Sequence, residues 1–134
     1  MIVVDTNLIA HFFIRSEYTG IAEKVFQKDN QWTAPILWRS EFRSVLVKCL
    51  RERFFTFQDA AQIMGEAEAL MEAFEYAVGS LDVLRVASSS DCSVYDAEFI
   101  VLAQELAVPL VTLDKKILET FPETAISLVR FVED

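Results

Sequence analysis

The sequence predicts a three-layer α/β/α sandwich with a central, mainly parallel β-sheet. Two observations support this fold class. Short apolar stretches alternate with helical patterns along the whole chain, as expected when parallel strands are joined by helices. The strand runs IVV, LVTL and ISLV are also apolar almost throughout, which burial on both faces of a parallel sheet requires. A length of 134 residues is enough for one hydrophobic core, so we expect a single domain over residues 1–134.

Short β-branched or apolar runs predict the strands. We expect them at Ile2–Val4, Gln31–Ala34, Phe74–Val78, Pro109–Leu113 and Ile126–Val132. In parallel sheets of this kind, ligands bind outside the carboxyl ends of the strands. Functional side chains are therefore expected where these strands end.

Helical patterns fill the segments between the strands. Pro35 suits the first turn of the third helix. Thr56 with Asp59, and Ser93 with Asp96, have the spacing of capping boxes and open two longer helices. We expect helices at Thr6–Arg15, Gly20–Lys28, Ile36–Arg53, Thr56–Ala73, Leu81–Ser88, Ser93–Ala107 and Lys115–Phe121.

Composition and charge exclude several classes of protein. No apolar run approaches the ~20 residues that a membrane span needs, and the N-terminus has no basic leader. Cys49 and Cys92 form no pattern, which favours reduced thiols and a cytoplasmic location. The net charge of −9 argues against broad nonspecific binding to nucleic acid. Bases are concentrated between Arg39 and Arg53, whereas Phe54–Leu84 has acids but no Lys or Arg; both could be ordinary solvated helix faces.

Two acids directly follow predicted strands. Asp5 follows Ile2–Val4, and Asp114 follows Leu110–Leu113. If these strands are parallel neighbours, both carboxylates lie at the same edge of the sheet. The alternative for each is a helix cap, because Asp is a preferred N-cap residue and a helix is expected to begin directly after it.

Two further acids lie on helices. Asp96 falls on the apolar side of its helix, at about 60° from Phe99, and burial of an unpaired carboxylate is costly. Capping with Ser93 explains this position only in part, which favours a ligand or a paired group. Glu41 lies at the border of an apolar stripe, where a solvated surface role is the alternative. His11 sits in an apolar segment and is expected to pack rather than to catalyse.

Carboxylates that converge on one point repel each other unless a cation is present. Mg²⁺ prefers oxygen ligands and commonly combines one or two carboxylates with substrate phosphates. Such a site can place a water in line with a phosphodiester and stabilise the leaving oxygen. No Ser-His-Asp set can be assembled, and CxxC, P-loop and GxGxxG motifs are absent.

Three blocks of the sequence resemble the PIN-domain family, and within it the VapC-type toxin ribonucleases. VVDTN resembles the opening strand and first acid of that family. PILWRSEFRSVL resembles the second acid, in a helix after a proline, and CSVYDAEFIVLAQELAVPLVTLD resembles the third acid, the linking helix and a T-x-D strand. The blocks follow the family's order across nearly the whole chain.

The resemblance implies an endoribonuclease that uses a metal-activated water. It also implies a homodimer and neutralisation by a small antitoxin. It assigns the binding of Mg²⁺ or Mn²⁺ to four carboxylates: Asp5, Glu41, Asp96 and Asp114. Thr112 is expected to orient a water or a carboxylate, and Asn7 to hold the first acid by hydrogen bonding.

The acidic composition means that RNA would need a local basic path, for which we expect Arg39, Arg43, Lys115 and Lys116. We also expect a second copy, an antitoxin segment or the protein's own core to cover the aromatic residues Trp38, Phe54, Phe55 and Phe57.

Three alternatives remain open at this point. One is a nuclease or phosphohydrolase of this fold that acts outside a toxin–antitoxin pair, for example in RNA processing. Another is a catalytically silent binding module. The third is a response-regulator receiver domain, which would need an acidic pair after the first strand; only Asp5 is found there.

Overall fold

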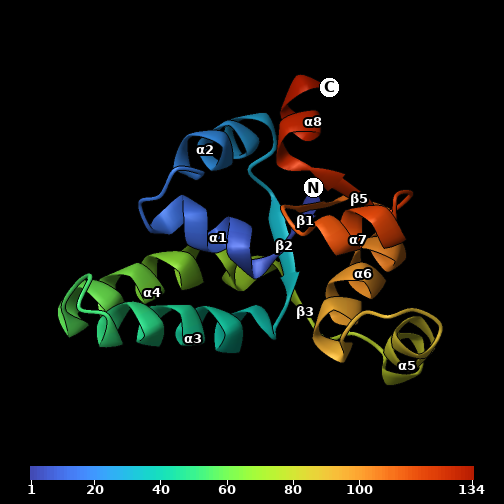
Figure 1. The fold of residues 1–134 in the computed structure, drawn as a ribbon, viewed down its shortest axis with the longest axis horizontal. Helices are drawn as coiled ribbons and strands as arrows, with labels where there is room; N and C mark the ends of the chain where they lie inside the picture. Colours follow the sequence, from blue (N-terminus) through green and yellow to red (C-terminus); the bar gives the residue numbers. More distant parts are fainter.

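The computed structural model describes residues 1–134. Its centre is a five-stranded sheet in the order β3-β2-β1-β4-β5, and every pair of neighbouring strands is parallel. Helices cover both faces of the sheet (Figure 1), so the predicted α/β/α class is confirmed. The strands are β1 (Ile2–Val4), β2 (Trp32–Pro35), β3 (Glu75–Tyr76), β4 (Leu110–Thr112) and β5 (Ala125–Ser127).

The strand order reverses at β1. From β1 the chain adds β2 and β3 on one side, and β4 then returns to pair with the other side of β1. A reversal of this kind leaves a crevice outside the carboxyl ends of the two central strands. The register of β1 and β4 pairs Val4 with Val111, so Asp5 and Thr112, the next residue of each chain segment, lie at the same edge.

The helices form two layers, one on each side of the sheet (Figure 1). One layer contains α1 (Thr6–Phe13), α2 (Thr19–Lys28), α3 (Trp38–Arg51) and α4 (Phe57–Met71). The other contains α5 (Ser80–Ser88), α6 (Val94–Leu106) and α7 (Lys115–Thr120). A 3₁₀ turn (Glu72–Phe74) follows α4, and α8 (Leu128–Glu133) packs against α2 at the end of the chain. None of the helices combines the length and the apolar character that a bilayer crossing requires.

The core lies on both faces of the central strands, because every residue of β1, β2 and β4 is buried. Trp38 is completely buried in this core, so it does not belong to an exposed aromatic surface as one expectation allowed. Phe54 and Phe57 do remain on the surface, with 70% and 76% of their area exposed, whereas Phe55 is partly buried against the core.

One predicted strand is wrong. The apolar run Ile126–Val132 is not a single strand: β5 ends at Ser127, and the chain continues as α8. Ser127 caps this helix, because its hydroxyl accepts a hydrogen bond from the backbone N–H of Arg130 at 3.2 Å. The periodicity of a short apolar run does not distinguish a strand from a buried helix, and Ser127 within such a run fits a strand as well as a helix cap. The other predicted elements are present, with boundaries that differ by a few residues.

The turn that joins α6 to β4 contains a residue in the left-handed region. Ala107 has φ 55° and ψ 42°, and its N–H bonds back to the carbonyls of Ala103 and Gln104. This turn fixes how α6, which carries Asp96, meets the strand that carries Thr112. Alanine has a steric penalty in this conformation that glycine avoids.

Replacing Ala107 by glycine is therefore expected to raise the free energy of unfolding by about 0.5–1 kcal/mol. The matched control is Ala61→Gly on the exposed side of α4, which should lower the same quantity by about 1 kcal/mol because glycine disfavours a helix interior. Urea unfolding of both variants measures the difference. Equal destabilisation by the two substitutions would contradict the role given to this turn.

Candidate active site at the carboxyl edge of the sheet

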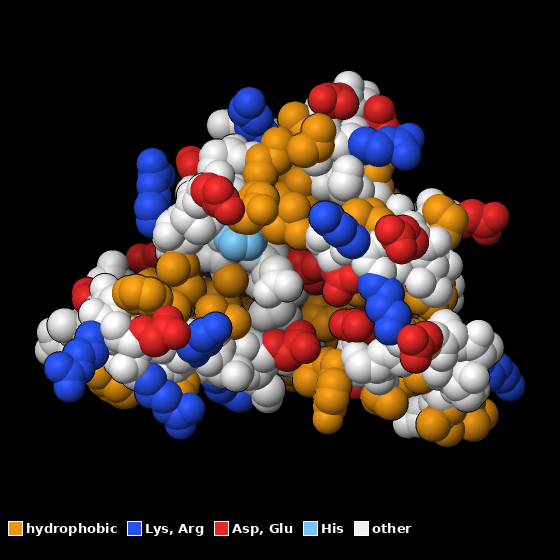
Figure 2. All heavy atoms as spheres, in the orientation of Figure 1, with side chains coloured by type: hydrophobic (Ala, Val, Ile, Leu, Met, Phe, Trp, Pro, Cys, Tyr) orange, Lys and Arg blue, Asp and Glu red, His pale blue; other side chains and the backbone are white.

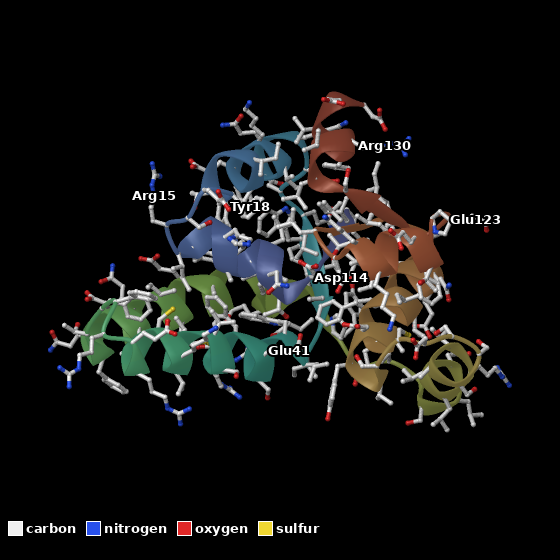
Figure 3. The ribbon with its side chains drawn as sticks, in the orientation of Figure 1. Arg15, Tyr18, Glu41, Asp114, Glu123 and Arg130 are labelled. Atoms are coloured by element: carbon white, nitrogen blue, oxygen red, sulfur yellow. The ribbon has the colours of Figure 1, made fainter.

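A small pocket opens where the carboxyl ends of β1 and β4 meet. Its volume is about 120 Å³, and the four acids singled out from the sequence all line it: Asp5, Glu41, Asp96 and Asp114. The rest of the lining is Thr6, Asn7, Val45, Phe99, Leu110 and Ile117. Figure 2 shows acidic side chains gathered at the centre of this face, between the two helical layers. In Figure 3, Glu41 of α3 and Asp114 approach this centre from opposite sides.

Asp5 lies between β1 and α1 and uses both of its carboxylate oxygens. Oδ1 accepts a hydrogen bond from the backbone N–H of Leu8 at 2.9 Å and so caps α1. Oδ2 accepts a short hydrogen bond from the hydroxyl of Thr112. Capping and a place in the pocket are therefore not alternatives for this residue.

Thr112 connects two of the acids. It is completely buried in β4, and while its hydroxyl donates to Asp5 it accepts the backbone N–H of Asp114 at 3.0 Å. Asp114 in turn caps α7 through the N–H of Ile117 at 3.0 Å. This threonine fixes the position of one carboxylate and the backbone of a second.

Asp96 does not complete a capping box. Ser93 caps α6 by accepting the N–H of Asp96 at 3.0 Å, but the Asp96 carboxylate makes no return bond to the backbone of Ser93. In α4 the equivalent bond is present, because the Asp59 carboxylate accepts the N–H of Thr56 at 3.0 Å. Capping therefore does not account for the Asp96 carboxylate, which lines the pocket instead.

Glu41 reaches the pocket from α3, where the hydroxyl of Thr6 donates to it at 2.6 Å. Thr6 is buried on α1, and sequence reasoning did not select it. Its position next to Asp5 in the DTN motif was the available signal. Asn7 also lines the pocket, but it makes no hydrogen bond to Asp5. The role expected of Asn7 is carried out by Thr112 and the N–H of Leu8.

The pocket concentrates negative charge. Burial raises the pKa of Asp5 to about 6 against the hydrogen bonds from Thr112 and Leu8, and the charges of Asp114 and Glu41 raise it further. Burial and then neighbouring acids also raise the pKa values of Glu41 and Asp96, with Asp114 the main charge acting on Asp96. No Lys, Arg or His lines the pocket, although the charge of nearby Lys116 acts to lower the pKa of Asp96.

The family model for the PIN domain matches residues 2–123, which includes all of β1 to β4 and every acid of the pocket. The chain belongs to the PIN-domain family. Ribonuclease VapC3 from Pyrobaculum aerophilum is 27% identical over 124 residues, covering 90% of this chain and 95% of that protein.

Two solved structures share this PIN-domain fold. The crystal structure of PAE2754 from Pyrobaculum aerophilum superposes with a TM-score of 0.75 at 22% identity, covering 98% of this chain and 96% of the other. A toxin–antitoxin complex from Klebsiella pneumoniae contains a chain that superposes with a TM-score of 0.71 at 14% identity, covering 96% of this chain and 98% of the other.

The donor set of this PIN-domain pocket fits a hard divalent cation. Four carboxylates and no basic side chain line it, and oxygen ligands are those that Mg²⁺ and Mn²⁺ prefer. As the side chains are placed, however, no three of the Asp, Glu, His and Cys residues stand close enough together to enclose one ion directly. Instead, Asp5 accepts a hydrogen bond from the hydroxyl of Thr112, and Glu41 accepts one from the hydroxyl of Thr6.

Two bases of the expected basic path, Arg39 and Arg43, are directed away from the acids of the pocket. Residues two positions apart on an α-helix differ by about 200°, so Arg39 and Arg43 do not lie beside Glu41. Arg39 faces α4 instead: two of its guanidinium nitrogens bond to Glu75, one of them at 2.8 Å, and a third bonds to Glu68. Arg39 therefore joins α3 to α4 and β3.

The remaining predicted bases differ in their partners. Lys116 pairs with Asp91 at 3.1 Å, whereas Lys115 is exposed and makes no ion pair.

His11 lies outside the pocket, where its ring bonds to Ser16 at 2.7 Å and packs on Tyr18 at 4.8 Å between centroids. His11 therefore packs against its neighbours, as expected.

The raised pKa of Asp5 has a consequence for stability. A carboxyl whose pKa is 3.8 when unfolded and about 6 when folded favours the folded state only while it is protonated. The metal-free protein should therefore lose about 3 kcal/mol from this group as the pH rises through that window. Asparagine can cap α1 equally well. Asp5→Asn should therefore become more stable relative to the wild type between pH ~4 and pH ~6, as measured by thermal unfolding with EDTA.

Asp59→Asn is the control for this experiment. Asp59 is exposed, and its hydrogen bonds with Thr56 lower its pKa instead of raising it. This variant should gain nothing over the wild type across the same range. A wild type and an Asp5→Asn variant with parallel pH profiles would show that Asp5 does not titrate in this way.

Proposed function

We propose that this PIN-domain protein is a Mg²⁺- or Mn²⁺-dependent endoribonuclease that hydrolyses RNA phosphodiester bonds, and that it is the toxin of a type II toxin–antitoxin pair. The observation that carries the proposal is the pocket at the carboxyl edge of the sheet, to which four separate segments contribute a carboxylate and no segment contributes a basic side chain. The name of the relative, Ribonuclease VapC3, supports RNA as the substrate.

In this proposal Asp5, Glu41, Asp96 and Asp114 hold the divalent ion. A bound ion supplies activation of a water and neutralises charge on the phosphate and the leaving oxygen. Thr112 and Thr6 donate hydrogen bonds to Asp5 and Glu41, and so hold these two acids in place before an ion binds. Positions fixed in this way reduce the reorganisation needed when substrate arrives.

In this proposal the four carboxylates bind the ion, and apart from them no side chain of the pocket is suited to covalent catalysis. Ser, Cys, Lys and His are absent from its lining, and the hydroxyl of Thr6 already donates to Glu41. Nucleophilic catalysis needs such a group with a base beside it. Direct attack by water on the phosphodiester is therefore the reaction that these residues support.

The partners belong to the same proposal. In this proposal a second copy of the chain or an antitoxin segment covers Phe54 and Phe57, two exposed rings at the start of α4. The solved toxin–antitoxin complex from Klebsiella pneumoniae shares the fold, which is consistent with such a partner. Cys49 and Cys92 are both free, which fits a reducing cytoplasm.

Replacing Asp96 by asparagine tests the mechanism most simply. Asparagine leaves the Ser93 cap intact but removes a negative charge from the pocket. Cleavage of total RNA in Mn²⁺ should fall by roughly 100-fold or more, as expected for a damaged metal site. The melting temperature without metal should stay the same or rise, because one of several crowded charges is removed.

Asp59→Asn provides the matched control, since Asp59 has the same spacing from its cap residue Thr56 but lies outside the pocket. Its cleavage rate should equal that of the wild type, and EDTA should abolish cleavage by both. An Asp96→Asn protein that cuts RNA at the wild-type rate would overturn the mechanism.

The same assay separates the alternatives. A catalytically silent binding module would leave RNA intact even as the wild type in Mn²⁺. A PIN-domain nuclease of RNA processing would cut RNA, but no small protein encoded beside it would neutralise the activity. A toxin is expected to be inhibited when that neighbour is added in equal amount.

A further inference from the structure

Two lysines without an ion-pair partner lie on segments that contribute acids to the pocket. Lys115 begins α7 directly after Asp114, and Lys48 lies on α3, the helix that contributes Glu41. Both side chains are exposed, and neither takes part in an ion pair. Figure 2 shows Lys and Arg side chains on both sides of the central acidic cluster.

Lys48 continues the row of α3 side chains that forms one wall of the pocket. Glu41 and Val45 both line the pocket, and Lys48 follows them at the spacing i, i+4, i+7. Seven residues are about 20° short of two full helical turns, so Lys48 points to the same side as Glu41 and lies about 10 Å further along the axis. That side faces α1, because Thr6 of α1 bonds to Glu41.

Arg43, another exposed base on α3, points in a different direction. Arg43 is two residues from Glu41 and points away from the pocket by about 200°. Like Lys48 it is exposed and makes no ion pair. The two residues therefore differ mainly in the direction in which they present their charge.

We propose that an RNA strand crosses the pocket from Lys115 on α7 to Lys48 on α3, and that these two ammonium groups bind phosphates on either side of the cleaved bond. The inference rests on the proposed ribonuclease function. A protein with a net charge of −9 and an acidic pocket repels a polyanion, so local cations must supply the attraction. Neither lysine lines the pocket, which leaves the carboxylates free for the metal ion.

Salt-dependent RNA binding tests the path. All proteins carry Asp96→Asn, so that bound RNA is not cleaved, and a fluorescently labelled RNA oligonucleotide of mixed sequence is titrated at several KCl concentrations. Each lost phosphate contact should reduce the slope of log affinity against log salt by about 0.7 for a single strand. Lys48→Gln and Lys115→Gln should each show this loss, and together about twice as much.

Arg43→Gln is the matched control and should keep the slope and affinity of the parent. Lys48→Arg should restore the parent slope, which a merely structural defect at Lys48 would not allow. Equal slopes for Lys48→Gln and Arg43→Gln would overturn the path while leaving RNA cleavage in place. A parent protein that binds no RNA at any salt concentration would overturn both the path and the proposed function.

Discussion

The parallel pairing of β1 with β4 places Asp5 next to Thr112, and the rest of the site depends on this contact. One buried hydroxyl donates to Asp5 and accepts the backbone N–H of Asp114, so the ends of two strands are fixed relative to each other. A register shift of one residue would turn Thr112 to the opposite face of the sheet and break both bonds. The reversal of strand order thus determines both the position of the pocket and the orientation of its first acid.

Several of the acids serve the fold and the pocket at once. Asp5 and Asp114 cap α1 and α7 with one carboxylate oxygen each, which leaves the second oxygen of each residue outside the cap. The caps offset part of the cost of crowding negative charges in a half-buried place. Burial is the main reason that the pKa of Asp5 is raised, and the charges of Asp114 and Glu41 raise it further. A bound cation would favour the charged form of these carboxylates.

The sequence was sufficient to predict the alternation of strands and helices. The positions of Asp5 and Asp114 after strands, and of Asp96 on an apolar helix face, singled these acids out, but only the family resemblance added Glu41 and joined the four into one site. Contacts between distant segments could not be predicted in the same way. The ion pair of Arg39 with Glu75 depends on how α3 packs against α4 and β3. The end of β5 at Ser127 was missed for a local reason, because a capping serine within an apolar run also fits a strand.

The central claim is that the four carboxylates act together as a site for one or more divalent cations. The most direct test is an anomalous difference map from crystals of this protein grown with Mn²⁺. The account predicts a peak in the pocket, in contact with Asp5 and at least one other of the four acids, and no such peak in crystals of Asp5→Asn. A map in which Mn²⁺ is bound elsewhere on the protein, with the pocket empty at a saturating concentration, would contradict it.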